Sequence, residues 1–294
     1  MYQIDLHIHS IYSDGTDTVE KIVKQSQSQK LDLIAITDHN TLDHITDLKK
    51  YAKKYKQKAL AGIELSTAYH HHEIHVLGYF PISDDFESSR YNSLHQFLAE
   101  YKQTKVIQNE SIIMKLKKRF PDISLIEFYQ FTNSQNINRV HIAKYMMYKG
   151  YVKDMNTAFN QYIGTHCPFY VKRKEMSLQR GIEAIKAAEG VSVIAHLGEY
   201  EFNDKDIDLF IKDCIQYKID GFECYHPLND EQIIEIIQKH SDMILTAGSD
   251  YHGLNKKNND LGMPYNFSMN KMQQNQYNET IEKAYYYFKK WVVL

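Results

Sequence analysis

The N-terminal segment of this chain alternates apolar residues with side chains that commonly bind metals. In the run Asp5-Leu-His-Ile-His, His7 and His9 emerge from the same face of a predicted strand, about 7 Å apart. Asp14 follows a few residues later. Two imidazoles and a carboxylate aimed at one region are donors that a divalent transition metal prefers. The segment therefore predicts a strand that ends in a metal site.

Similar donors recur along the chain, each expected at or just beyond the end of a predicted strand. In a parallel α/β barrel the C-terminal ends of the strands meet at one mouth, so these side chains should gather in one pocket. Polar groups brought together there without a ligand would cost ~1–3 kcal/mol for each one left unpaired, which favours a metal site. The predicted donors are His7, His9, Asp14, His39, Glu64, His75, His196, Asp250 and His252.

Short apolar strands alternate with helical patterns over most of the chain. Alternation of this kind favours a parallel sheet, and the strand count indicates a (β/α)7 barrel that resembles the TIM type with one unit missing. We expect strands at residues 2–8, 31–37, 60–67, 73–80, 191–195, 219–224 and 243–247. We expect helices between them at residues 18–29, 42–56, 178–189, 205–217 and 229–240.

Residues 84–176 interrupt this alternation. They carry helical patterns and no convincing strand. We therefore predict a helical cap subdomain over residues 84–176, inserted into a barrel formed by residues 1–83 and 177–294. The helical patterns of the insert cover residues 84–119, 122–132, 138–149 and 154–163.

Composition and charge limit the classes of partner. The 294 residues are 43% hydrophobic and 24% charged with a net charge of −2, so no overall positive field attracts long nucleic acids. Three widely spaced cysteines favour a reducing compartment over a disulfide framework. No apolar run approaches the ~20 residues that span a bilayer, and the N-terminus leaves no room for a signal peptide. We expect a cytoplasmic protein without a membrane partner, and the oligomeric state stays open.

The number and type of the donors indicate the chemistry. A metal site takes ~3–5 protein groups, so the predicted set implies two or three ions. Mixed imidazole and carboxylate donors suit Mn, Fe or Zn, whereas Mg prefers oxygen ligands. Clustered divalent ions activate a bridging water and clamp phosphate oxygens, which favours phosphoester hydrolysis. Deacetylation or amide hydrolysis by the same donors remains an alternative.

An ordered set of motifs makes the chain similar to a known family. Across nearly its whole length the chain resembles the PHP (polymerase and histidinol phosphatase) superfamily. The resemblance implies a distorted seven-stranded α/β barrel and a metal-dependent phosphoesterase. The motifs are Asp5-Leu-His-Ile-His-Ser, Ala35-Ile-Thr-Asp-His-Asn-Thr, Gly62-Ile-Glu-Leu-Ser, Glu73-Ile-His-Val-Leu-Gly, Ile194-Ala-His, Gly221-Phe-Glu-Cys-Tyr-His-Pro and Gly248-Ser-Asp-Tyr-His-Gly.

The resemblance also implies a trinuclear centre and divides the donors among three divalent ions, for which we expect Mn, with Fe or Zn as alternatives. Asp38 is expected to serve catalysis by orienting ligand imidazoles. The first ion would be held by His7, His9, Glu64 and Asp250, the second by Glu64, His75 and His196, and the third by Asp14, His39 and His252.

The insert carries Asn138-Arg-Val-His-Ile-Ala-Lys-Tyr-Met-Met, which resembles the branch of nucleoside 3′,5′-bisphosphate phosphatases and 5′→3′ exoribonucleases acting on short RNA. In that branch the insert closes over the barrel mouth. Arg139 would then serve catalysis by gripping a second, non-reacting phosphate. The chain departs from the branch after His196, where Leu-Gly-Glu replaces Pro-Gly-Arg and removes one phosphate contact. The expected substrate-binding residues are Arg139, His141, Lys172 and His226.

These features predict hydrolysis of a phosphomonoester by a hydroxide that bridges two ions. The expected substrate is a nucleoside 3′,5′-bisphosphate or the 5′ end of a short oligoribonucleotide. Histidinol-phosphate phosphatase is the first alternative, and a long cap that carries Arg139 suits a doubly phosphorylated ligand better. A non-catalytic or proofreading-type module is the alternative from another class, and the full donor set argues against it.

Overall fold

The computed structural model describes residues 2–70, 72–82, 86, 88–132, 137–200, 202–265 and 268–292. The chain divides into two compact units, Met1–Phe97 with Met176–Leu294, and Leu98–Glu175. The second unit begins later than the insert expected at residue 84. The reason is packing, because Tyr91 and Phe97 are buried and the ring of Tyr91 lies 5.8 Å from that of Phe80 in the first unit.

The first unit is built around a seven-stranded sheet whose strands pair in chain order, which confirms the predicted seven-stranded barrel. A parallel bridge between Ile8 and Tyr251 brings the last strand's exit back to the first strand, so the barrel is nearly closed. The strands are β1 (Ile4–Ile8), β2 (Leu33–Ile36), β3 (Ala59–Tyr69), β4 (His72–Phe80), β5 (Val191–Ile194), β6 (Gly221–Tyr225) and β7 (Ile244–Ala247).

The expectation of parallel strands throughout is wrong for β4, which pairs antiparallel with both β3 and β5. The reason lies in the connection. β3 ends at Tyr69 and β4 begins at His72, which is far too short for the crossover that a parallel pair requires. His75 consequently lies near the start of its strand, whereas we expected it where a strand ends. Because β4 runs in reverse, its start reaches the same barrel end as the other donors.

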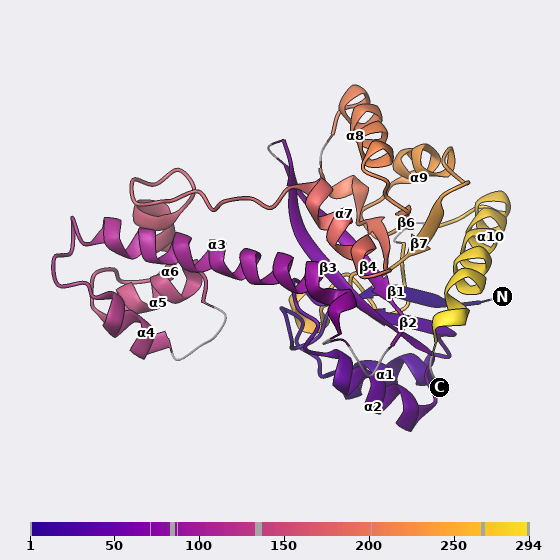
Figure 1. Ribbon diagram of the computed structural model, residues 1–294, viewed down its shortest axis with the longest axis horizontal. Coiled ribbons are helices and arrows are strands. Elements are labelled where there is room, and N and C mark those ends of the chain that lie inside the picture. Colours follow the sequence, from indigo (N-terminus) through magenta and orange to yellow (C-terminus); the bar gives the residue numbers. More distant parts are fainter. Residues whose placement is uncertain are drawn as a thin grey trace. The chain divides into compact units, whose positions relative to one another are not determined.

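Helices surround the sheet, with α1 and α2 together on one side and α8 and α9 on another (Figure 1). Their amphipathic patterns explain the packing. α1 buries Val19, Ile22 and Val23, and its N-cap is Thr18, whose side chain accepts a hydrogen bond from the backbone N–H of Lys21. The helices are α1 (Val19–Ser28), α2 (Ile45–Tyr55), α7 (Leu178–Ala187), α8 (Asp204–Gln216), α9 (Glu231–Gln238) and α10 (Lys271–Phe288). Short 3-10 turns are η1 (Ser89–Tyr91), η3 (Leu197–Tyr200), η4 (Gly253–Asn255) and η5 (Lys289–Trp291).

The second unit is helical with its own hydrophobic core, and its described residues contain no strand. Residues 154–163 form α6 and a π-helical turn where one helix was expected. Among the described residues of the chain, no helix has both the length and the apolar composition to cross a bilayer. The helices are α3 (Asn92–Leu116), which enters from the first unit, α4 (Leu125–Thr132), α5 (Arg139–Tyr148), α6 (Met155–Ala158) and η2 (Phe159–Ile163).

Candidate metal centre

Glu64 of β3 lies at the centre of a cluster of imidazoles at one end of the barrel. Its side chain is 1% exposed, and both of its carboxylate oxygens face ring nitrogens. Such an arrangement requires a pocket in which several strand ends converge. The oxygens lie 2.9–3.3 Å from the nearest ring nitrogens of His7, His9, His39, His75 and His196.

Asp250, which follows β7, supplies a second buried carboxylate. Its Oδ1 atom lies 3.6 Å from His7 Nε2, 3.4 Å from His9 Nε2 and 3.3 Å from His252 Nδ1. Its Oδ2 atom forms an ion pair with Lys256, which was not among the predicted site residues. Asp250 therefore joins His7 of β1 and His9, which follows β1, to the segment after β7.

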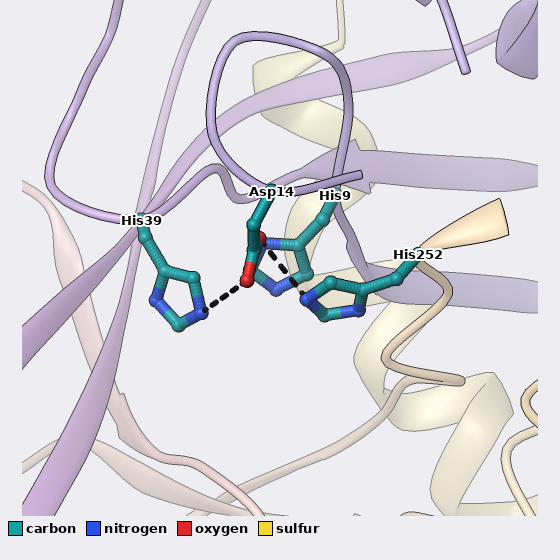
Figure 2. A group of neighbouring side chains, drawn as sticks. All are labelled: His9, Asp14, His39 and His252. Carbon is teal, nitrogen blue, oxygen red and sulfur yellow. Dashed lines mark ion pairs between the residues drawn. The ribbon is translucent and has the colours of Figure 1, made fainter. Parts of the chain in front are cut away.

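Asp14 forms the outer part of the cluster (Figure 2). Its carboxylate lies 3.1 Å from His252 Nε2, 3.6 Å from His9 Nδ1 and 3.8 Å from His39 Nε2. Asp14 is 55% exposed and His39 is 25% exposed, so solvent reaches the cluster on this side. The structure thus brings all the predicted donors together, with a buried part around Glu64 and an open part around Asp14.

The backbone is unusual where two donors leave their strands. His196 and Asp250 have φ values of +29° and +54°, in the left-handed region that residues with a side chain rarely adopt. Gly248 lies where β7 passes β1, and a Cβ atom there would meet His7 Cβ at 2.2 Å and Glu223 Oε1 at 2.5 Å. Only glycine permits this close approach, and the local strain is typical of functional sites.

The arrangement of donor atoms suits divalent cations. The Nε2 atoms of His7 and His9 lie 3.1 Å apart, close to the spacing of two imidazoles on one ion with metal–nitrogen distances of about 2.0–2.1 Å. His39 Nδ1 and His252 Nε2 are buried without a hydrogen bond among the described residues, although carboxylate oxygens lie 3.1 Å away. Several groups of three or four donor atoms lie within 4.8 Å of one another. The donor set therefore fits more than one divalent ion.

The pKa shifts of the donor side chains also bear on whether the cluster can hold cations. Burial opposes protonation of His7, but the carboxylates of Glu223, Glu64 and Asp250 outweigh it and raise its pKa well above the usual value. Burial likewise opposes the charged form of His75, yet Glu64 holds its pKa at about 10. The pKa of Glu64 itself lies well below its usual range, because neighbouring imidazoles overcome the effect of burial. The buried carboxylates therefore favour positive charge beside His7 and His75, whereas burial lowers the pKa of His39 to about 3.

Glu223 of β6 was not among the predicted site residues. Its carboxylate lies 3.0 Å from His7 Nδ1 and accepts a hydrogen bond from the backbone N–H of His196 at 2.8 Å. This contact fixes the His7 ring so that Nε2 faces the cluster, an arrangement common behind metal-binding histidines. The available signal was a charged residue within the apolar run Gly221-Phe-Glu-Cys, which is fully buried here.

Replacing Glu223 with glutamine is expected to weaken Mn binding by about 10–100-fold, because His7 loses its ionic partner while the side chain keeps its shape. Titration calorimetry measures this change, with the exposed Glu231→Gln on α9 as the matched control. An unchanged affinity in a Glu223→Gln protein with the wild-type melting temperature would contradict the assigned role.

Asp38, which was expected to orient ligand imidazoles, reaches His9 through Ser13 in this structure, and its role in orienting ligands stays a prediction. Its buried carboxylate accepts hydrogen bonds from Ser10 and from Ser13 Oγ, and it lies 3.0 Å from His44 Nδ1. Ser13 Oγ in turn lies 3.4 Å from His9 Nδ1. Asp38 therefore holds the loop that follows β1 and acts on His9 only through Ser13.

The predicted substrate-binding residues occupy different places. His226 is fully buried, with Nε2 3.5 Å from Asp250 Oδ2, so it lies among the donors. Arg139 and His141 begin α5 in the second unit, where His141 Nδ1 is engaged with Asn138 in the helix cap. Lys172 lies 2.9 Å from Glu175. Contacts of these four residues with substrate remain predictions.

A nearly closed seven-stranded barrel with a buried cluster of imidazoles and carboxylates defines the class of metal-dependent hydrolases. A family model described as the PHP domain matches residues 5–290, and the chain therefore belongs to the PHP domain family. The resemblance to the PHP superfamily that the motifs carry is thus confirmed.

Curated relatives align over most of this chain. It is 25% identical over 254 residues to a 5′-3′ exoribonuclease of Haemophilus influenzae, covering 84% of this chain and 89% of the relative. It is 27% identical over 270 residues to a 3′,5′-nucleoside bisphosphate phosphatase of Chromobacterium violaceum, and the alignment covers 89% of this chain and 91% of the relative. It is 22% identical over 266 residues to a phosphoribosyl 1,2-cyclic phosphate 1,2-diphosphodiesterase of Eggerthella lenta, covering 85% and 94%.

Two solved structures share the fold. An amidohydrolase from Chromobacterium violaceum is similar with a TM-score of 0.68 and 22% identity, covering 99% of this chain and 97% of the other. A candidate metal-dependent phosphoesterase from Bifidobacterium adolescentis gives a TM-score of 0.66 and 23% identity, covering 95% and 96%. At these identities the likenesses support the fold alone.

Proposed function

We propose that this protein hydrolyses a terminal phosphate ester of a nucleoside 3′,5′-bisphosphate or of the 5′ end of a short oligoribonucleotide. The coarser class, a metal-dependent hydrolase of phosphate esters, follows from family membership and from the relatives' names. The observation that carries the proposal is the gathering of nine imidazole and carboxylate donors, with Glu64 and Asp14 among them.

The donors would divide as the family resemblance implies. His7, His9 and Asp250 would share one ion, His75 and His196 a second, and both ions would contact Glu64. When bound, such ions supply an activated water and neutralise the phosphate oxygens. The third group would consist of Asp14, His39 and His252, joined in this structure by His9.

The chain's own residues would prepare the reaction in three ways. Glu223 and the backbone carbonyl of Asp250 hold the Nδ1 atoms of His7 and His252, at 3.0 and 2.9 Å, so that both Nε2 atoms face the cluster. The exposed side of Asp14 gives a phosphate access to the donors. The buried carboxylates keep the pocket selective for cations, so a phosphate enters only when cations have offset their charge.

Arg139 is the proposed contact for the second phosphate. Its guanidinium lies 5.2 Å from the ring centre of Tyr170 and 5.9 Å from that of Phe159, and one N–H reaches the carbonyl of Ile163 at 3.4 Å. No carboxylate of the described residues lies within ion-pair distance of it. The remaining N–H groups are therefore available for a bidentate contact with a phosphate.

A substrate panel tests the proposal. We expect Mn-supplemented protein to release phosphate or nucleotide from adenosine 3′,5′-bisphosphate and from 5′-phosphorylated dinucleotides faster than from histidinol phosphate. Arg139→Ala should lower kcat/KM for the bisphosphate by about 10–100-fold, as the loss of hydrogen bonds to a charged group implies. The same change should affect adenosine 5′-monophosphate far less.

The matched control is Arg119→Ala, which removes an exposed arginine stacked on Phe120 in the same unit. Equal losses with both nucleotides would contradict the role of Arg139. Preference for histidinol phosphate would overturn the proposed substrate and favour the alternative phosphatase.

A further inference from the structure

Lys256 places a positive charge beside Asp250, at the end of the barrel where the donors gather. Its Nζ atom forms an ion pair with Asp250 Oδ2. Asp250 is buried, whereas the side chain of Lys256 is 42% exposed. Lys256 therefore connects a buried donor with the solvent from which a substrate arrives.

The two oxygens of Asp250 face different groups. Oδ1 lies 3.3–3.6 Å from ring nitrogens of His7, His9 and His252, whereas Oδ2 is the partner of Lys256. A cation held by Oδ1 and the imidazoles therefore leaves the contact between Oδ2 and Lys256 in place. A lysine ammonium group has three N–H donors, and the hydrogen bond to Asp250 uses one of them. Further donors remain for an anion at the metal centre.

The segment that carries Lys256 is attached to both parts of the donor cluster. Asn255 Nδ2 donates to the backbone carbonyl of Asp14 at 2.6 Å, and Asn259 Nδ2 donates to that of Asp250 at 3.3 Å. These contacts fix the backbone on either side of Lys256, and the ion pair with Asp250 fixes the end of the side chain. The positive charge is therefore a built part of the site.

Exposed carboxylates at the cluster would repel a phosphate. Asp14 is 55% exposed, and Glu199 is 47% exposed with Oε2 2.8 Å from His196 Nδ1. Glu199 is the glutamate of the Leu-Gly-Glu run, so this chain has a negative charge where Pro-Gly-Arg would supply a positive one. A fixed ammonium group beside the donors offsets part of this repulsion.

We infer that Lys256 binds a non-bridging oxygen of the phosphoryl group that reacts at the metal centre. A lysine suits this place because its ammonium group is a compact charge whose N–H groups can turn to meet an oxygen. The contact stabilises negative charge on the phosphoryl group and transfers no proton.

This inference rests on the proposed function, since it takes the substrate to be a phosphate ester. It concerns the reacting phosphate, whereas Arg139 is the proposed contact for the second one. Lys256 belongs to the same compact unit as the donors, so its place beside them follows from the contacts of that unit.

The test measures the binding of inorganic phosphate to the full-length, Mn-loaded protein by titration calorimetry. Lys256→Gln removes the charge, and Lys256→Arg keeps it. Lys257→Gln is the matched control, because it makes the same change at the neighbouring exposed lysine. Elemental analysis of the same samples gives their Mn content.

We expect Lys256→Gln to bind phosphate about 10–100-fold more weakly at the wild-type Mn content, as the loss of a hydrogen bond between charged groups implies. Lys257→Gln should keep the wild-type affinity, and Lys256→Arg should lose far less than Lys256→Gln. The kcat/KM of Lys256→Gln should fall by similar factors for adenosine 3′,5′-bisphosphate and adenosine 5′-monophosphate, because both contain a reacting phosphate.

Wild-type phosphate affinity in Lys256→Gln, or equal losses in the two glutamine variants, would overturn the inference. A loss of phosphate affinity that accompanies an equal loss of Mn would also overturn it, because Lys256 would then only hold Asp250 in place. Failure of the proposed function gives a different result. In that case the wild type would release no product from the bisphosphate, while Lys256→Gln would still bind inorganic phosphate more weakly than Lys257→Gln.

Discussion

Glu64→Gln is expected to reduce phosphate release by more than the roughly 10–100-fold loss that follows removal of an outer-sphere partner of a metal ligand. Both oxygens of Glu64 face imidazoles, and among the described residues no other carboxylate lies close to as many predicted donors. Glutamine has almost the same shape but no charge, and its amide NH2 group would point at ring nitrogens. We therefore expect the loss of at least the two ions that Glu64 would share.

Phosphate release from adenosine 3′,5′-bisphosphate, measured at saturating Mn, checks this expectation. The control is Glu279→Gln, which makes the same change in an exposed ion pair with Lys283 on α10. Circular dichroism should show an intact fold, because the change is nearly isosteric. Turnover within a few-fold of the wild type would contradict the central position of Glu64.

Asp14→Asn is expected to have the second largest effect, a loss of at least about tenfold in turnover. Asp14 contacts His9, His39 and His252 but not Glu64, so its loss should weaken the outer donor group and leave the inner one intact (Figure 2). The side chain is 55% exposed, and the melting temperature of the metal-free protein should change little.

The matched control for Asp14→Asn is the exposed Asp122→Asn in the second unit. Phosphate release and Mn binding, measured on the same preparations, separate a missing ion from a damaged fold. Turnover equal to that of the control would show that the outer donor group is not needed for the reaction.

The sequence was sufficient to predict the barrel because most positions of its strands are buried on both faces and therefore form short apolar runs. Donor residues such as His39 and His196 could be predicted because each is a polar residue that follows directly after an apolar run. The direction of β4 was not predicted, since a strand has the same pattern in both directions. The short connection between Tyr69 and His72 was the only local signal.

Partners that support the donors were harder to predict. Glu223 contacts His7, which lies far from it in the sequence. Lys256 contacts Asp250 through an irregular loop. Only the folded chain brings each of these pairs together. The loop contacts of Asp38 likewise depend on where Ser10 and Ser13 lie after β1 ends. The contacts of Arg139 with substrate stay a prediction, because they depend on a ligand.

The number of ions bound per chain is the decisive measurement for the proposed metal centre. Elemental analysis after Mn loading and removal of excess metal should find two to three ions in the wild type, about one fewer in Asp14→Asn, and one or none in Glu64→Gln. Less than one ion in the wild type, or equal contents in all three proteins, would contradict the assignment of these imidazoles and carboxylates to a common metal centre.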